Sequence, residues 1–230
     1  MPYPTMTLFQ TRRMRRRLMR HHLPLLIASA ASVAALYFTR DYRDAITRAS
    51  FATAYPALAL LATTLLIGPL NLLRKQTNPI SSDLRRDIGI WAGILGILHT
   101  GIGQCVHLRG RPWLYYVYGP EEHHHAFPVR HDLFGLANYT GVFSVLLLAA
   151  LFATSNDYML RKMHTQSWKK LQRWNYAVFA LAALHSFAYQ GVEKQHMPFV
   201  VTVAVCVAIA IAFQIAGIVM RRRAKPAWLR

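Results

Sequence analysis

The sequence predicts an all-α integral membrane protein with six transmembrane helices and with both termini in the cytoplasm. Three observations support this fold class. Of the 230 residues, 54% are hydrophobic and only 16% are charged, yet the formal net charge is +18. The apolar residues gather in stretches close to the ~20 residues that a helix needs to cross a membrane. The basic residues gather between these stretches, which marks membrane topology and argues against a nucleic-acid-binding protein.

Hydropathy places the six spans at residues 23–38, 52–73, 88–108, 133–154, 174–191 and 199–220. Residues 1–22 form a basic N-terminal tail, and residues 221–230 form a basic C-terminal tail. The connections are too short to fold into a separate soluble domain. We therefore expect one helical membrane domain over residues 23–220.

Local signals mark the ends of the first three spans. The first span follows a basic stretch and resembles a signal sequence, but we expect it to stay uncleaved because five spans follow. In the second span, Pro69 lies near the inner end, where neighbouring helices can satisfy the freed carbonyl groups. The third span begins after a turn, with Ser81 or Ser82 as its cap and Asp83 in its first turn.

The distribution of Lys and Arg predicts the orientation of the bundle. Most of the 27 basic side chains lie in the two tails and in residues 74–86 and 161–173. Connections rich in Lys and Arg stay on the cytoplasmic side. Residues 40–50, 109–131 and 192–198 are therefore expected on the outer side of the membrane.

Two histidines lie in the middle of predicted spans. His99 and His185 each follow the inner end of their span by 11 residues, or about 16 Å of helix, so both should lie at the same depth. Ionisable residues at membrane depth are costly and are candidates for function. The same helix face carries small residues near each histidine: Ala92, Gly96 and Gly103 near His99, and Val178, Ala182 and Ala188 near His185.

Small residues beside a histidine leave room for a flat macrocycle, although they also favour close helix packing. Two neutral imidazoles that face each other across such a slot suit bis-histidine ligation of haem iron. For each histidine, an ordinary hydrogen bond between helices is the alternative.

Three segments carry a resemblance to a known family. RRDIGIWAGILGILHTGIG and WKKLQRWNYAVFALAALHSFAYQGVEK resemble the third and fifth helices of the ferric reductase-like transmembrane family. LALLATTLLIGPLNLLRK resembles the second helix of the MsrQ (YedZ) branch, the haem b membrane partner of a periplasmic molybdopterin methionine sulfoxide reductase. The resemblance covers residues 50 to 220 approximately. It implies a six-helix haem b protein of the bacterial inner membrane, with His99 and His185 as ligands of the haem iron.

The resemblance also bears on the number of haems. In two-haem members of the family, a second histidine precedes the fifth-helix ligand by 13 residues, and Gln172 occupies this position here. Because glutamine is a poor haem ligand, we expect one haem, in the outer half of the bilayer.

The inner rim is rich in cations, including Arg85, Arg86, Lys169, Lys170 and Arg173. These side chains could bind a flavin phosphate, a haem propionate or a quinol headgroup. The alternative is that they anchor the protein in the membrane, together with interfacial tryptophans.

The long outer connection carries further histidines. EEHHH at residues 121–125, with His131 beyond it, is either a transition-metal site or a solvated loop. His107 lies 8 residues after His99, about 12 Å nearer the outer face. It could be an alternative ligand, a hydrogen-bond partner of a haem propionate, or an ordinary interfacial residue. This connection is also where an acceptor, either a periplasmic protein or a ferric ion, would dock.

The sequence thus predicts a membrane electron-transfer protein, an oxidoreductase component that receives electrons from a quinol or from a separate cytoplasmic flavoprotein. The chain contains no dinucleotide-binding glycine motif, no P-loop and no CxxC pair. The alternative is a small transporter or channel that uses intramembrane histidines as a proton or metal relay. A relay of that kind favours acidic residues at depth, and the spans contain essentially none away from their ends.

Overall fold

The computed structural model describes residues 8–39, 44–75, 83–108, 110–120, 128–192 and 197–224, and the structure of these residues is helical almost throughout. The elements are α1 (Leu8–Arg17), the π-helical turn η1 (Leu18–His22), α2 (Leu23–Thr39), α3 (Ala45–Leu73), α4 (Asp83–Gly103), the 3-10 turn η2 (Pro112–Tyr115), α5 (Leu133–Ala153), α6 (Asp157–Gln172), α7 (Asn175–Val192) and α8 (Met197–Ala224). An isolated antiparallel bridge joins Val117 to Val129 in the outer segment.

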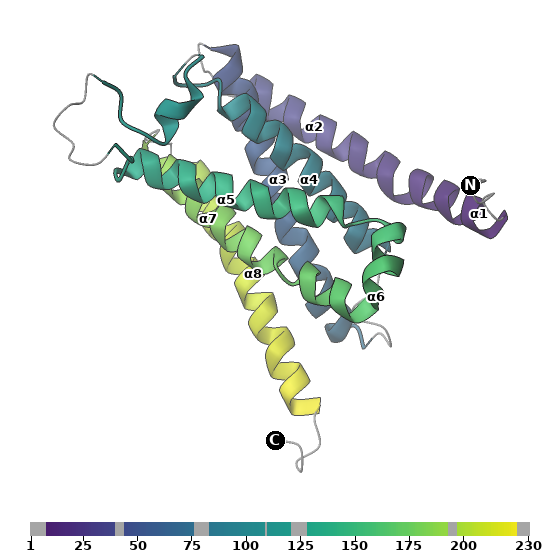
Figure 1. Ribbon diagram of the computed structural model, residues 1–230. Coiled ribbons are helices and arrows are strands. Elements are labelled where there is room, and N and C mark those ends of the chain that lie inside the picture. The colour runs from purple at the N-terminus through teal and green to yellow at the C-terminus, as the bar shows by residue number, and fades with distance from the viewer. Residues whose placement is uncertain are drawn as a thin grey trace.

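Two closely packed helix pairs form the centre of the bundle. Helix α3 packs along α4, and α5 packs along α7, whereas α4 and α7 do not pack against each other over any length. Helices α2 and α8 both lie against α3, and the C-terminal part of α8 extends away from the other helices (Figure 1). The space between α4 and α7 is therefore bordered by the two pairs.

Within the described residues, four helices are long and apolar enough to cross a membrane: Thr11–Thr39, Ala45–Leu73, Leu133–Ala153 and Met197–Arg223. They correspond to the first, second, fourth and sixth predicted spans, and the chain is a multi-pass helical membrane protein. The third and fifth predicted spans are the helices α4 and α7. Helix α4 begins with four charged residues within five positions, and α7 has only 18 residues. A total of six crossings, with both termini in the cytoplasm, stays a prediction.

Side-chain caps define where several helices begin. The carboxylate of Asp44 accepts a hydrogen bond from the main-chain nitrogen of Thr47 at the start of α3, and Asp132 does the same for Gly135 at the start of α5. Asn156 caps α6 through Met159. Such caps satisfy main-chain donors that the first helical turn leaves without partners.

Helix α6 was not expected from hydropathy, which treats this region as a basic connection. Its sequence, DYMLRKMHTQSWKKLQ, is too polar to give a membrane signal, but it has an N-terminal cap and an amphipathic pattern.

The N-terminal segment also differs from the expected tail, because residues 8–22 are helical and continue into α2. One face of this helix contacts the beginning of α4. The guanidinium of Arg17 forms an ion pair with Asp87, whose side chain is 0% exposed. His21 Nδ1 lies 2.7 Å from Asp87 Oδ2, and His22 Nε2 lies 3.3 Å from Asp87 Oδ1. The π-helical turn occurs at this contact, where two consecutive histidines reach one carboxylate.

A second group of ion pairs joins α1, α4 and α6. The side chain of Arg13 lies 2.6 Å from Asp83, and that of Arg86 lies 2.6 Å from Asp157 and 3.4 Å from Asp83. The hydrogen bond from Arg13 lowers the pKa of Asp83 below its usual value. The pair therefore stabilises the fold above the usual pKa of a carboxyl group, and this contribution is lost as the pH falls through the lowered pKa.

We expect Asp87→Asn to destabilise the protein by about 3–5 kcal/mol, because it leaves the charge of Arg17 without its partner in a largely buried contact. The measurement is thermal unfolding followed by circular dichroism in detergent. The matched control is Asp157→Asn, whose carboxylate is 39% exposed and whose partner Arg86 keeps Asp83; we expect about 1 kcal/mol or less. An equal loss of stability in the two variants would contradict a special role for Asp87.

Candidate functional site

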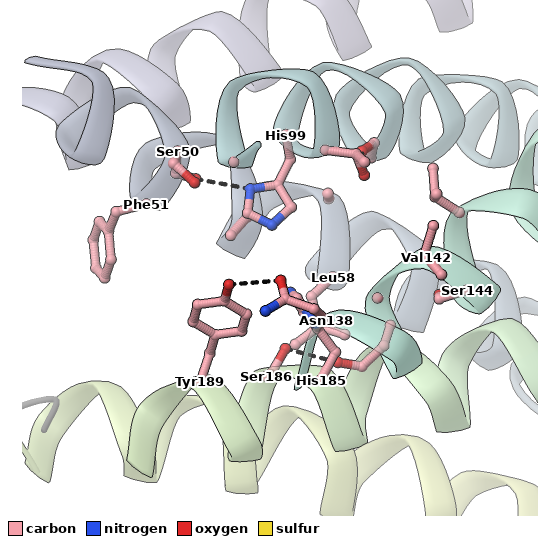
Figure 2. A pocket seen from close by; sticks show the side chains of 18 of the residues that line it. Ser50, Phe51, Leu58, His99, Asn138, Val142, Ser144, His185, Ser186 and Tyr189 are labelled. Carbon is pink, nitrogen blue, oxygen red and sulfur yellow. Dashed lines mark hydrogen bonds between the residues drawn. The ribbon is translucent and has the colours of Figure 1, made fainter. Parts of the chain in front are cut away.

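His99 on α4 and His185 on α7 face each other across the space between the two helix pairs. Their ring centroids lie 6.0 Å apart, and the ring planes are inclined by 74°. The predicted match in depth is therefore confirmed. Figure 2 shows the His99 ring pointing from α4 towards α7, with Tyr189 and Asn138 beside the gap.

Main-chain carbonyl groups orient both rings. His99 Nδ1 lies 3.0 Å from the carbonyl oxygen of Ser50 on α3, and His185 Nδ1 lies 2.7 Å from that of Ala137 on α5. Because a carbonyl oxygen can only accept, each Nδ1 carries the hydrogen, and each Nε2 has a lone pair. Histidines that bind metal ions in proteins are held in the same way.

The two rings border a cavity lined by residues of α3, α4, α5, α7 and α8. The space that the centres of water molecules could occupy in this cavity is about 210 Å³. A single water needs ~10–15 Å³ of such space, so the cavity is much larger than a water site. Of the small residues predicted beside the histidines, Ala92, Gly96, Gly103 and Ala182 line this cavity. Val178 and Ala188 are buried but are not part of its wall. Most of the predicted small face therefore borders the cavity.

Gly141 on α5 allows His185 to occupy its position. A Cβ atom at residue 141 would lie 2.6 Å from His185 Nδ1 and 2.9 Å from its Cε1, closer than carbon atoms approach in folded proteins. Any side chain here would push the imidazole ring away. Sequence reasoning missed this residue because the contact joins two separate helices.

Hydroxyl groups in the middle of the cavity are bonded to main-chain carbonyls. Thr100 donates to Gly96, Ser186 donates to Ala182, and Ser144 donates to Val178, at distances of 2.8 to 3.1 Å. The described residues that line the cavity include no carboxylate. This part of the wall is therefore effectively apolar, which disfavours a proton or metal relay.

The outer end of the cavity is covered by the segment that follows α4. Tyr115, which is 0% exposed, donates its hydroxyl hydrogen to the carbonyl of Gly103 at 3.1 Å and accepts from the main-chain nitrogen of His107 at 2.8 Å. Arg130 Nε donates to the main-chain carbonyl of Leu114 at 2.9 Å. The hydroxyl of Tyr139 donates to the main-chain carbonyl of Tyr116. His107 lines this end of the cavity but is itself exposed, as the interfacial alternative predicts.

Arg85 and Arg86 are not among the residues that line the cavity. The side chain of Arg86 is 8% exposed and is held by Asp83 and Asp157. Burial lowers the pKa of Arg85. Gln172, at the position of a possible second ligand, lies with its Nε2 3.4 Å from Ser155 Oγ. Cofactor binding by the two arginines stays a prediction.

The histidine cluster at residues 121–125 lies outside the described residues. His131 is described, and its Nδ1 lies 3.5 Å from the hydroxyl of Tyr118. Within the described ranges, no group of three or more His, Cys, Asp or Glu side chains could hold a metal ion. The two facing imidazoles of His99 and His185 could bind a metal ion if a further group, such as a macrocycle, supplied the other ligands.

Together, the helices and the facing imidazoles define a membrane protein with a buried cavity between two potential metal ligands. The curated proteins that are similar in sequence include two that are each named protein-methionine-sulfoxide reductase heme-binding subunit MsrQ. The one from Pectobacterium carotovorum is 34% identical over 130 residues, which cover 56% of this chain and 57% of the relative. The one from Pectobacterium atrosepticum is 32% identical over 130 residues, with the same coverage.

The similarity to MsrQ that the sequence predicted is confirmed, and the chain spans about half the length of the curated relatives it matches. No family model matches the chain. The relation to the wider ferric reductase-like family therefore stays a prediction.

We expect Gly141→Ala to destabilise the protein by about 1–3 kcal/mol, because the added methyl group overlaps the His185 ring. The matched control is Gly101→Ala on α4, where an added Cβ would meet nothing within 4 Å. Thermal unfolding of both variants in the same detergent measures the difference. A Gly141→Ala variant as stable as Gly101→Ala would contradict the close packing of His185 on α5.

Proposed function

We propose that this chain is a haem b membrane subunit that passes electrons across the membrane, with His99 and His185 as the two axial ligands of one haem. The spacing of the two rings supports this assignment most directly. The ring centroids lie 6.0 Å apart across the cavity, so both imidazoles would be within reach of one metal ion.

The hydrogen bonds of the two rings fit the same role. With each Nδ1 bonded to a carbonyl oxygen, the lone pair that can bind iron lies on Nε2. Gly103 and Ala182 add little bulk to the cavity wall, which favours a flat macrocycle beside the rings, whereas the missing side chain of Gly96 admits Leu148 of α5. The residues that line the cavity therefore fit a haem.

The bound haem would supply one-electron redox chemistry at its iron. The chain's own residues hold the ligands at fixed positions and surround the site with apolar side chains such as Leu58, Leu148 and Val203. Burial of this kind and the hydrogen bonds to the ligands set the reduction potential of a haem protein. The carbonyl groups of Ser50 and Ala137 make the bound imidazoles more basic.

The electron donor and the electron acceptor are assigned to opposite ends of the site. We assign the donor, a quinol or a separate cytoplasmic flavoprotein, to the basic inner rim of Arg85 and Arg86, where a flavin or quinone could bind. We assign the acceptor to the outer connection, residues 109–131. The relatives are named as one subunit of a protein-methionine-sulfoxide reductase, so a partner protein is favoured over a ferric ion as acceptor. This assignment includes six spans, cytoplasmic termini and the bacterial inner membrane.

The experiment that tests the function is the reduced-minus-oxidised visible spectrum of the detergent-purified protein, with haem quantified per chain. We expect a low-spin b-type spectrum near one haem per chain. His99→Ala and His185→Ala should each lose the haem or convert it to a high-spin form, because one axial ligand is missing.

The matched control is His131→Ala, which removes an outer histidine that does not line the cavity and should keep haem content and spectrum. A protein without haem despite ample haem supply would overturn the proposal and would favour a proton or metal relay. An unchanged spectrum in both ligand variants would overturn the ligand assignment.

A further inference from the structure

We propose that the outer end of the cavity is a carboxylate-binding subsite, in which His107 binds the propionates of the haem. This inference rests on the proposed function, because it concerns how the cofactor is oriented between His99 and His185. Sequence reasoning left open whether the propionates face the inner or the outer side.

The polarity of the cavity wall changes along its length. Away from the outer end, the polar side chains of the wall are hydroxyl groups: Thr100, Ser144 and Ser186, which donate to main-chain carbonyls, together with Ser50 and Tyr55. Amide and imidazole side chains gather towards the outer end: Gln104, His107, Asn138 and Gln190, with Thr47 and Tyr116. A cavity that is more polar at one end matches a ligand that is polar along one edge.

A buried oxygen atom at the outer end indicates a polar ligand atom or water nearby. Gln190 is 8% exposed, and its Oε1 has no hydrogen-bond partner among the described residues. Leaving a buried carbonyl oxygen unsatisfied is costly. Its Nε2 donates to the carbonyl of Phe199 at 3.4 Å, so the amide is already oriented. A water that donates to this oxygen and to a bound carboxylate would complete it.

The position of His107 is fixed by the chain that follows α4. Main-chain bonds from Cys105 to Ile102 and from Val106 to Gly103 turn the chain back over the cavity, so that His107 joins its wall. The imidazole stacks on Tyr189 at a centroid distance of 6.2 Å and also contacts Phe134 at 5.4 Å. Tyr189 is itself held by a 2.8 Å hydrogen bond to Asn138. An imidazole held in this way offers a nitrogen donor to a carboxylate at little entropic cost.

The charged groups around His107 are compatible with a bound carboxylate. Arg130 lies over the Phe134 ring at 5.4 Å and pairs with Asp132. None of Arg85, Arg86 and Arg130 lines the cavity, whereas His107 does. Because His107 can place a nitrogen donor in the cavity wall, the outer end is the better site for the propionates.

The experiment compares haem b with its dimethyl ester, in which both carboxylates are blocked. Each is titrated into apoprotein in detergent and followed by the Soret band. We expect His107→Ala to weaken binding of haem b by about 10-fold. Wild type and variant should bind the dimethyl ester with equal affinity, because the ester lacks the charge that His107 binds.

Two further variants keep the test specific. His107→Gln, which retains a nitrogen donor, should restore most of the affinity for haem b, and His131→Ala should change neither titration. The low-spin spectrum should persist in every variant, which shows that the axial ligands remain bound and that the proposed function stands.

Equal weakening of haem b and ester by His107→Ala would overturn the inference, because it would reflect lost packing. Unchanged binding of both would also overturn it. If Arg85→Ala weakens the binding of haem b and leaves the binding of the ester unchanged, the propionates lie at the inner end and the inference is wrong. Loss of the low-spin spectrum in wild type would overturn the proposed function itself.

Discussion

The site depends on two hydrogen bonds between a histidine and the main chain of a neighbouring helix. His99 is bonded to Ser50, and His185 is bonded to Ala137. In both cases the carbonyl group belongs to the helix that packs most closely on the histidine's own helix, α3 for α4 and α5 for α7. Each helix pair is therefore a complete half-site, which contains one imidazole and the group that orients it.

The two half-sites also pack directly on each other, α4 against α5 and α3 against α7, but the two helices that carry the histidines have few contacts. Because α4 and α7 do not pack over any length, the facing rings border a cavity instead of a helix interface. Gly141 allows the ring of His185 to lie against α5, and the outer segment around Tyr115 covers the cavity end. A cofactor bound by both rings would join the two pairs, so occupancy of the site and stability of the bundle are coupled by mass action.

Helical periodicity and hydropathy predicted the central features because both depend on local sequence. A rise of 1.5 Å per residue was enough to place His99 and His185 at one depth and to put Ala92 and Gly96 beside the cavity. The bonds to Ser50 and Ala137 were beyond prediction, because every residue has a carbonyl group and none is marked by its side chain. Helix α6 was missed because its stability comes from a cap and an amphipathic face, to which hydropathy is insensitive. The helical conformation of residues 8–22 was missed for a related reason, since it depends on tertiary ion pairs with Asp83 and Asp87.

The pairing of Arg17, His21 and His22 with Asp87 constrains the order in which the chain can assemble during synthesis. The first apolar helix leaves the ribosome long before α4, so its basic face has no carboxylate partner at that time. Because Asp87 follows Arg17 by 70 residues, this ion pair cannot form until α4 has been synthesised. The burial of Asp87 therefore accompanies the docking of the first helix on α4.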